Sequence, residues 1–332
     1  MLDNRSRRAQ LLTIYMKTSK KVNYYQVAQG VWGLKIVFVN IYMIANRRGV
    51  GNNGWVLVDA GLKGSASKIV SMAEALFGEG AKPEAIILTH GHFDHVGALQ
   101  ELLAYWEDVP VYAHPFELPY LTGHSSYPPA DPTVGGGLMS WISWLYPTKP
   151  IDISDRIQPL DTGGDIPELP EWKTIHTPGH TPGHISLFFK LNATLIAGDA
   201  FITTKAESAV YALSFAQKLS GPPKYLTTDW AEAAESVRKL YSLEPRIAAT
   251  GHGYVMRGKE LVTALAELVA HFEDTAIPAH GRYVKVPALA DRQGVEYIPP
   301  IEISVKVNIA LVALASIATG FFVAREVQKR YI

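Results

Sequence analysis

Three imidazoles and one carboxylate lie within six consecutive residues, His90-Gly91-His92-Phe93-Asp94-His95. This segment directly follows the apolar run Ala85 to Thr89, which is typical of a buried strand, so the possible ligands begin where a strand ends. Imidazole nitrogen and carboxylate oxygen bind zinc, and also iron or manganese. The alternative is a surface turn that is rich in histidine by chance, but short tracts of this kind more often bind metal. The sequence therefore predicts a metal site at this turn.

The composition limits what else the chain can do. Its 332 residues, of which 48% are hydrophobic, are enough to bury a large core in one catalytic domain. No cysteine is present, which excludes disulfides and thiolate metal ligands. The 31 basic and 31 acidic residues give a formal net charge of zero, so no nucleic-acid partner is expected.

Strand-like and helix-like runs alternate along the chain and must position these side chains. Runs rich in β-branched and aromatic residues predict strands, and apolar residues at helical spacing predict helices. The predicted strands are 32–44, 55–59, 85–89, 109–113, 172–176, 185–189, 194–197 and 246–249. The predicted helices are 65–77, 94–106, 230–241 and 259–272. Because the early strands follow one another closely, as in hairpins, a layered α/β sandwich fits better than a purely parallel sheet.

Five segments, taken in order, carry a family resemblance. The segment Thr89 to His95 resembles the HxHxDH signature of the metallo-β-lactamase superfamily, and four other segments resemble further motifs of that family. These are Leu57-Val58-Asp59-Ala60-Gly61, Thr177-Pro178-Gly179-His180-Thr181-Pro182-Gly183-His184, Gly198-Asp199 and Gly251-His252-Gly253. The resemblance extends from Tyr24 to Asp274. It implies a four-layer αββα sandwich of metallo-β-lactamase type and a metal-dependent hydrolase.

The resemblance also assigns metal ligands residue by residue. The implied ligands are His90, His92 and His180 for one ion, Asp94, His95 and His252 for a second ion, and Asp199 bridging the two. The expected cofactors are two divalent ions, with zinc the first expectation and iron or manganese the alternatives. A hydroxide shared by two such ions is a strong nucleophile at neutral pH. Asp94 is the candidate catalytic residue, as the proton carrier beside nucleophile and leaving group.

Other residues near the motifs have supporting or unrelated interpretations. His176 and His184 flank the third motif and either orient a ligand through a hydrogen bond or have no part in the centre. Asp59 is expected to hold the turn that carries the first histidines. Four further histidines are expected at the surface or in ordinary hydrogen bonds, namely His114, His124, His271 and His280.

The substrate class stays open, because this superfamily hosts several chemistries on one fold. Hydrolysis of a carboxylic ester, lactone or thioester is the first expectation. By resemblance, Asp199 counts against a β-lactamase, and the lone Lys205 after it counts against the glyoxalase II branch. The first tyrosine after Asp199 is Tyr211, so the usual helper tyrosine of the lactonase branch is missing. The alternatives are an iron-dependent oxidoreductase of the sulfur-dioxygenase type and a phosphodiesterase.

A long irregular insert, 114–152, offers the best clue to the substrate. Three glycines, Gly135 to Gly137, precede the strongly apolar stretch Leu138 to Tyr146. One interpretation is a lid over the metal centre that favours a small-molecule substrate with an apolar portion. The other is that Trp141 and Trp144 pack on the core or on a second subunit of a homo-oligomer.

The two ends of the chain are expected to lie outside the catalytic domain, 24–275. Residues 1–23 form a basic extension with no export signal, and Met16 is an alternative translation start. An extended linker is expected over 276–300, followed by a hydrophobic C-terminal helix over 301–332. Within that helix, 307–324 carries no charge and would extend about 27 Å, which suits either a membrane anchor or a helix docked on the domain. The expected location is therefore cytoplasmic or membrane-associated.

Overall fold

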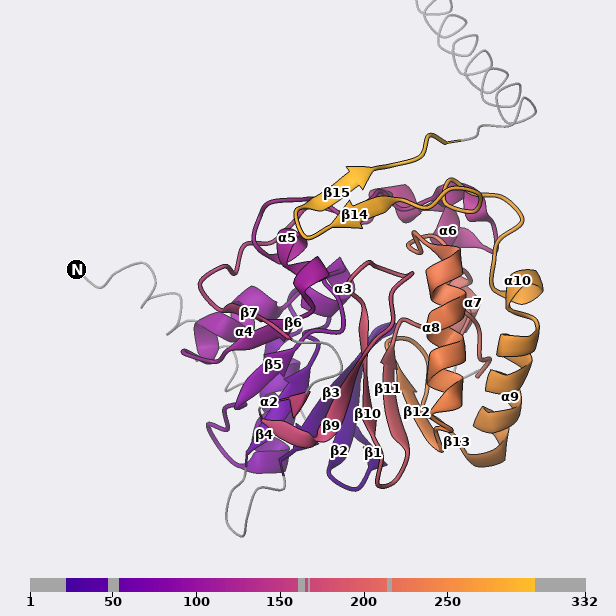
Figure 1. Cartoon of the computed structure of the whole chain (residues 1–332). Helices are drawn as coiled ribbons and strands as arrows, with labels where there is room; N and C mark the ends of the chain where they lie inside the picture. Colours follow the sequence, from indigo (N-terminus) through magenta and orange to yellow (C-terminus); the bar gives the residue numbers. More distant parts are fainter. Residues whose placement is uncertain (1–21, 47–53, 161–164, 167, 214–216, 302–332) are drawn as a thin grey trace, which may run out of the picture. The chain divides into compact units, whose positions relative to one another are not determined.

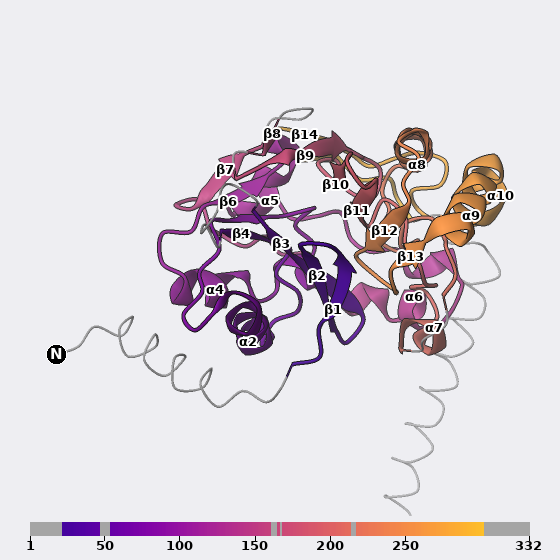
Figure 2. The same ribbon diagram turned by 90° about the horizontal axis from the view of Figure 1, so that it is seen from below.

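Two β-sheets lie face to face, and helices cover the outer side of each sheet (Figures 1 and 2). The first sheet has the strand order β1-β2-β3-β4-β5-β6-β7, and the second has the order β13-β12-β11-β10-β9-β8. Helices α2 and α4 lie on the first sheet, whereas α8 and α9 lie on the second (Figure 2). This layering agrees with the predicted αββα sandwich.

The computed structural model describes residues 22–46, 54–160, 165–166, 168–213 and 217–301. The chain divides into residues 1–299 and residues 300–332. The expected N-terminal extension and hydrophobic C-terminal helix lie outside the described residues, apart from 22–23 and 301. Among the described residues, no helix has the length and apolar character needed to cross a membrane.

The elements have the following bounds. The strands of the first sheet are β1 Tyr25–Ala28, β2 Val31–Ile36, β3 Val39–Ala45, β4 Trp55–Val58, β5 Ala85–Ile87, β6 Val111–Ala113 and β7 Ile157–Pro159. Those of the second are β8 Asp165–Ile166, β9 Leu169–His176, β10 Ile185–Phe189, β11 Thr194–Gly198, β12 Ile247–Thr250 and β13 Met256–Arg257. The longer helices are α2 Ala66–Phe77, α4 Leu99–Tyr105, α8 Trp230–Ser242 and α9 Gly258–Ala270. The shorter helices are α3 Phe93–Val96, η1 Pro115–Glu117, α5 Leu118–Leu121, η2 Pro132–Val134, α6 Leu138–Trp141, η3 Ser143–Leu145, α7 Ala209–Leu213 and α10 Phe272–Thr275.

Three apolar layers hold the sandwich together. One lies between the first sheet and its helices and includes Ile69 of α2 and Leu102 of α4. A second lies between the two sheets, where Val56 of β4 and Leu187 of β10 are both fully buried. A third joins the second sheet to α8 and α9. Burial of large apolar side chains on three levels is what makes the strand ends rigid enough to position ligands.

Two predicted elements are interrupted in the structure. The run 32–44 forms two antiparallel strands, β2 and β3, because the chain turns at Val37, which has a φ of 59°. The predicted helix 94–106 is divided into α3 and α4 at Gly97, whose amide donates to Gly61 O at 2.7 Å. A Cβ on Gly97 would lie 2.3 Å from Lys63 N. Since its φ of −58° is open to any residue, Gly97 is required for this close approach and not for an unusual backbone angle.

The insert and the segment after α10 pack on each other. Residues 276–300, predicted as an extended linker, contain the hairpin of β14 Leu289–Asp291 and β15 Gly294–Tyr297. The hydroxyl of Tyr283, which is 3% exposed, donates to Pro129 O at 2.7 Å, and Val295 N donates to Ser125 Oγ at 3.1 Å. This segment is therefore attached to the catalytic unit by specific hydrogen bonds, which the proline-rich sequence alone did not indicate.

Candidate metal centre

The possible ligands gather where strands of both sheets end. His90 and His92 follow β5, Asp199 follows β11 and His252 follows β12. The two sheets are joined here, since Asn40 N of β3 donates to Gly251 O at 2.8 Å and Asn40 Nδ2 donates to Thr250 O of β12 at 2.9 Å. All seven predicted ligands are at most 5% exposed. The structure therefore brings the seven together in a buried place.

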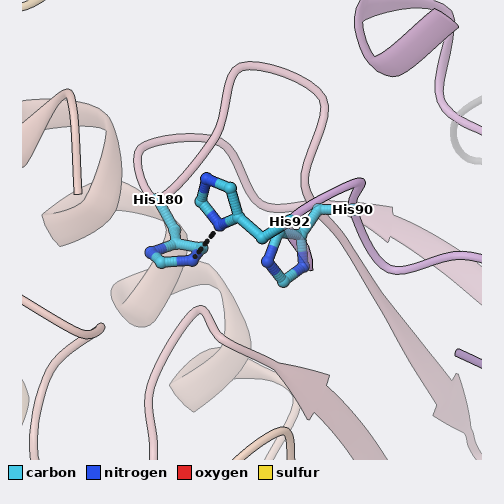
Figure 3. Close-up of side chains that lie close together, drawn as sticks. All are labelled: His90, His92 and His180. Carbon is cyan, nitrogen blue, oxygen red and sulfur yellow. Dashed lines mark hydrogen bonds between the residues drawn. The ribbon is translucent and has the colours of Figure 1, made fainter. Parts of the chain in front are cut away.

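Three of the histidines form a first cluster, defined as His90, His92 and His180 (Figure 3). One ligand atom from each lies within 4.8 Å of the others. Figure 3 shows the rings of His92 and His180 turned toward each other, with His92 Nδ1 3.0 Å from His180 Nε2. Three imidazoles at this spacing are suited to one metal ion.

Asp94, His95 and His252 form a second cluster with the same limit of 4.8 Å. His252 Nε2 lies 3.5 Å from Asp94 Oδ2. Asp199 lies between the clusters, because its Oδ2 is 3.5 Å from His180 Nε2 and 3.1 Å from His252 Nε2. Asp199 therefore lies within reach of both clusters.

Four of the five histidines are held through Nδ1, which leaves Nε2 facing the centre. Nδ1 of His90 meets Thr89 Oγ1 at 3.1 Å, and Nδ1 of His180 meets Thr227 Oγ1 at 3.3 Å. Nδ1 of His95 donates to Asp59 Oδ2 at 2.8 Å, and Nδ1 of His252 donates to Phe38 O at 2.9 Å. His92 is the exception and presents Nδ1. Such hydrogen bonds set the ring orientation and leave the other nitrogen with its lone pair.

The pKa values of the histidines are shifted in opposite directions in the two clusters. Burial and the neighbouring His95 lower the pKa of His92 to about 3, and burial lowers the pKa of His90 and His180 well below the ordinary value. Burial also acts to lower the pKa of His95, but the carboxylates around it, Asp59 first, raise it well above the ordinary value. The first cluster thus holds neutral imidazoles, and the second holds imidazoles among negative charges.

Several buried polar atoms of the centre have no hydrogen-bond partner among the described residues. They are His90 Nε2, His95 Nε2 and Asp199 Oδ1. A buried polar atom without a partner costs free energy, so such atoms need an explanation. Nitrogen and oxygen donors that converge without partners fit a pair of divalent cations, which would satisfy all three.

The supporting residues occupy the places that their interpretations require. Asp59 accepts from His95, from Thr89 N at 2.8 Å and from the Thr89 hydroxyl at 2.8 Å. His184 Nε2 accepts from Asp199 N at 2.8 Å, whereas His176 donates to Pro182 O and stacks on His114 away from the centre. His124, His271 and His280 are exposed, and His114, although buried, accepts from Phe116 N.

Three tyrosines near the centre were not predicted. Tyr127 packs on His92 with ring centroids 4.6 Å apart, and Tyr146 packs on Phe93 at 5.3 Å. Burial, then Tyr146 and the charge of Asp94, raise the pKa of Tyr225 well above the ordinary value. Burial and the charge of Asp94 raise the pKa of Tyr146 to about 12. No local motif marks these tyrosines, but Tyr127 and Tyr146 belong to the insert 114–152.

The two sides of the insert have different surroundings. Trp141 and Trp144 do not pack on the core, since they are 68% and 66% exposed. Tyr146 instead turns inward, with its ring 5.5 Å from that of Tyr225. The inner side of the insert therefore contributes to the surroundings of Asp94, while the tryptophans form an exposed apolar surface.

Comparison with known proteins gives one consistent result. A family model described as the metallo-beta-lactamase superfamily matches residues 34–252. The chain is 49% identical over 244 residues to the Probable metallo-hydrolase YflN of Bacillus subtilis, covering 74% of this chain and 91% of that one. It is 26% identical over 231 residues to a hydroxyacylglutathione hydrolase of Erwinia tasmaniensis, covering 69% of each. A solved β-lactamase domain protein from Burkholderia ambifaria has the same fold, with a TM-score of 0.52, 19% identity and coverage of 77% and 79%.

Proposed function

This chain belongs to the metallo-β-lactamase superfamily, and we propose that, as a metallo-hydrolase of that family, it cleaves a carboxylic ester, a lactone or a thioester. The observation that carries the proposal is the convergence of seven buried ligand side chains with unpartnered atoms at their centre. The proposed ligands are His90, His92 and His180 for one ion, Asp94, His95 and His252 for the other, and Asp199 for both. Zinc is the proposed metal, with iron or manganese as alternatives.

Two divalent ions bound by these residues would lower the pKa of a water molecule toward neutrality and polarise the carbonyl oxygen of a substrate. Asp94 is the residue that we assign to proton transfer. Asp94 is 4% exposed, and in the metal-free protein burial raises the pKa of its carboxyl. A carboxyl beside the nucleophile and the leaving group can take up and return a proton. Its place beside His252 and the inward-facing tyrosines puts it next to the reacting atoms.

Tyr146 and Tyr225 are candidates for holding the substrate. Both hydroxyls stay protonated at neutral pH, because burial and the charge of Asp94 raise their pKa. The hydroxyl of Tyr146 donates to Met139 O at 3.2 Å, so we assign the hydrogen bond to a substrate carbonyl to Tyr225 and the apolar contact to the ring of Tyr146. In this proposal Tyr225 serves as the helper tyrosine that the sequence directly after Asp199 lacks, which suits an acyl substrate with an apolar portion.

The name of one relative supports the same class of substrate. A hydroxyacylglutathione hydrolase hydrolyses an acyl compound, and this chain matches 69% of that protein. The lone Lys205 after the bridging aspartate still counts against glutathione as the leaving group here. An acyl ester, lactone or thioester with an apolar portion is therefore the class to test first.

The test is a panel of esters, lactones, thioesters and phosphodiesters with zinc-, manganese- and iron-loaded protein. We expect hydrolysis of an acyl substrate by a protein with two metal equivalents. When the variant is saturated with metal, Asp94→Asn should lower kcat by about 100-fold or more and change KM by less than about threefold. Turnover of phosphodiesters alone, or oxygen consumption by a protein with one iron and no hydrolysis, would contradict the proposal.

A further inference from the structure

One buried carboxylate outside the seven ligands joins the two loops that carry the first cluster. Glu117, at the end of η1, is fully buried. Its Oε2 accepts from Gly91 N at 2.9 Å and from the hydroxyl of Tyr127. Its Oε1 accepts from Gly183 N at 2.9 Å and from the Thr181 hydroxyl at 2.7 Å. Four donors on one carboxylate make a strong, charge-assisted connection between segments that are far apart in the chain.

The bonded residues are direct neighbours of the ligands. Gly91 lies between His90 and His92, and Thr181 follows His180. All three members of the first cluster are therefore within one residue of a group that Glu117 holds. In the part of the chain that the structure describes, the second cluster is held elsewhere, by Asp59 and by Phe38 O.

The glycines of both loops are explained by the same carboxylate. A Cβ on Gly183 would lie 2.7 Å from Glu117 Cγ, and a Cβ on Gly91 would lie 2.6 Å from the Tyr127 hydroxyl oxygen. Neither glycine has a φ in the left-handed region. Glycine is needed at these two positions because the Glu117–Tyr127 pair approaches the backbone too closely for a side chain.

We infer that Glu117 is a positioning residue for the first metal ion: it sets the spacing of His90, His92 and His180 by holding Gly91 and Gly183 at its two oxygens. It does not touch the reacting atoms. The inference rests on the proposed two-metal centre and adds that Glu117 acts on the first ion. Loss of Glu117 should weaken the binding of the first ion and leave the affinity for the second unchanged.

Glu117→Gln tests this because the change keeps the shape. An amide has one oxygen and one NH₂ group, and each carboxylate oxygen of Glu117 receives a backbone N–H, which cannot rotate away. Whichever way the amide turns, its NH₂ group faces the N–H of Gly91 or of Gly183. One loop must therefore move, and we expect the affinity for the first metal to fall by about 10- to 100-fold.

Two backgrounds show which ion is affected. In His252→Ala, the ion that still binds occupies the first cluster, and adding Glu117→Gln should weaken its binding in a zinc titration against a chelator. In His180→Ala, the remaining ion occupies the second cluster, and adding Glu117→Gln should change its affinity by less than about threefold. Equal losses in both backgrounds, or no loss in the first, would overturn the inference.

Two further variants separate positioning from general damage. Glu207→Gln is the matched control, since Glu207 is a buried glutamate whose Oε1 accepts from a single backbone donor, Lys224 N, at 2.9 Å. An amide oxygen can serve that donor, so both metal affinities should stay at the wild-type value. If Glu117→Gln does not fold, Tyr127→Phe removes one donor from Oε2, and a loss confined to the first ion is still expected. A wild-type protein that binds no metal would overturn the proposed function, whereas wild-type affinities in folded Glu117→Gln would overturn this inference alone.

Discussion

The two clusters of candidate ligands are held in place by different kinds of contact. The first cluster holds three imidazoles with lowered pKa values, and its loops are tied together through backbone amides at Glu117. The second cluster is held through its side chains, since Asp59 accepts from the His95 ring and Phe38 O accepts from the His252 ring. The first cluster thus has a buried carboxylate that binds the backbone of its loops, and the second has one that binds an imidazole ring directly.

Replacing each of these carboxylates by the amide of the same shape should therefore affect the two clusters differently. A carboxylate that holds backbone acts on ligand spacing, whereas a carboxylate that holds an imidazole acts on which nitrogen carries the proton. Loss of Asp199, which contacts both clusters, should affect them together.

The largest effect is expected for Asp199→Ala. Its Oδ2 lies 3.1 to 3.6 Å from nitrogens of His180, His95 and His252, so both ions lose a ligand. We expect both metal affinities to fall by at least about 100-fold, with loss of hydrolysis. Metal analysis after dialysis measures this, and full retention of either equivalent would refute the bridging role. Asp229→Ala is the control, because Asp229 caps α8 and its loss costs about 1 kcal/mol of stability without reaching the metals.

A smaller and selective effect is expected for Asp59→Asn, the counterpart of Glu117→Gln. Asn tolerates the φ of 62° at this position, so the backbone is not strained. The amide can still accept from Thr89 N, but its NH₂ group then faces Nδ1 of His95 and moves the ring proton toward Nε2. The second ion should bind about 10- to 100-fold more weakly. The first ion should lose less affinity, because Asp59 reaches His90 only through the Thr89 hydroxyl. Chelator titrations in the His180→Ala and His252→Ala backgrounds measure the two changes, and an equal or larger loss in His252→Ala would contradict this prediction.

The seven candidate ligands were assigned from the family resemblance, and strand ends account for four of their positions, since His90 and His92 follow β5, Asp199 follows β11 and His252 follows β12. Glu117 was beyond this reasoning, since it binds amides 26 and 66 residues away. Its partners depend on how the insert folds back over the two loops. The same holds for Tyr127, Tyr146 and Tyr225, which come from segments without periodic patterns.

Element boundaries failed where tertiary contacts decide them. The predicted helix 94–106 has an apolar period throughout, yet Gly97 packs against the backbone of Leu62 and Lys63, and this contact divides the helix. Strand β1 and the β14–β15 hairpin were missed because their partly exposed residues lack the continuous apolar run that marks the equally short β4 and β5.

In the metal-free protein, His92 and His95 should change the pH dependence of stability in opposite directions. The pKa of His92 falls from 6.5 in the unfolded chain to about 3, so its contribution to stability is complete above pH 6.5 and is lost as the pH falls toward 3. The pKa of His95 is raised, so its contribution is complete below pH 6.5 and is lost as the pH rises through the folded value. His92→Gln should reduce the acid-side loss by about 1.4 kcal/mol per pH unit, and His95→Gln should reduce the alkaline-side loss. Urea unfolding at several pH values measures both changes. If both variants altered stability on the same side of the pH range, this difference between the clusters would be refuted.

The smallest effect is expected at the outer surface of the insert, which contacts neither cluster. Trp141→Ser and Trp144→Ser alter side chains that are 68% and 66% exposed, so the free energy of unfolding should change by less than about 0.5 kcal/mol. Both metal affinities should also stay at the wild-type value. If the insert receives the apolar part of the substrate, KM for long-chain acyl substrates should rise while KM for short ones does not. Tyr225→Phe is the inner counterpart, and because Tyr225 is the proposed donor to the substrate carbonyl, the change should lower kcat for both chain lengths. A change in metal affinity in either tryptophan variant would mean that the insert supports a cluster, and the division into two separately held clusters would fail.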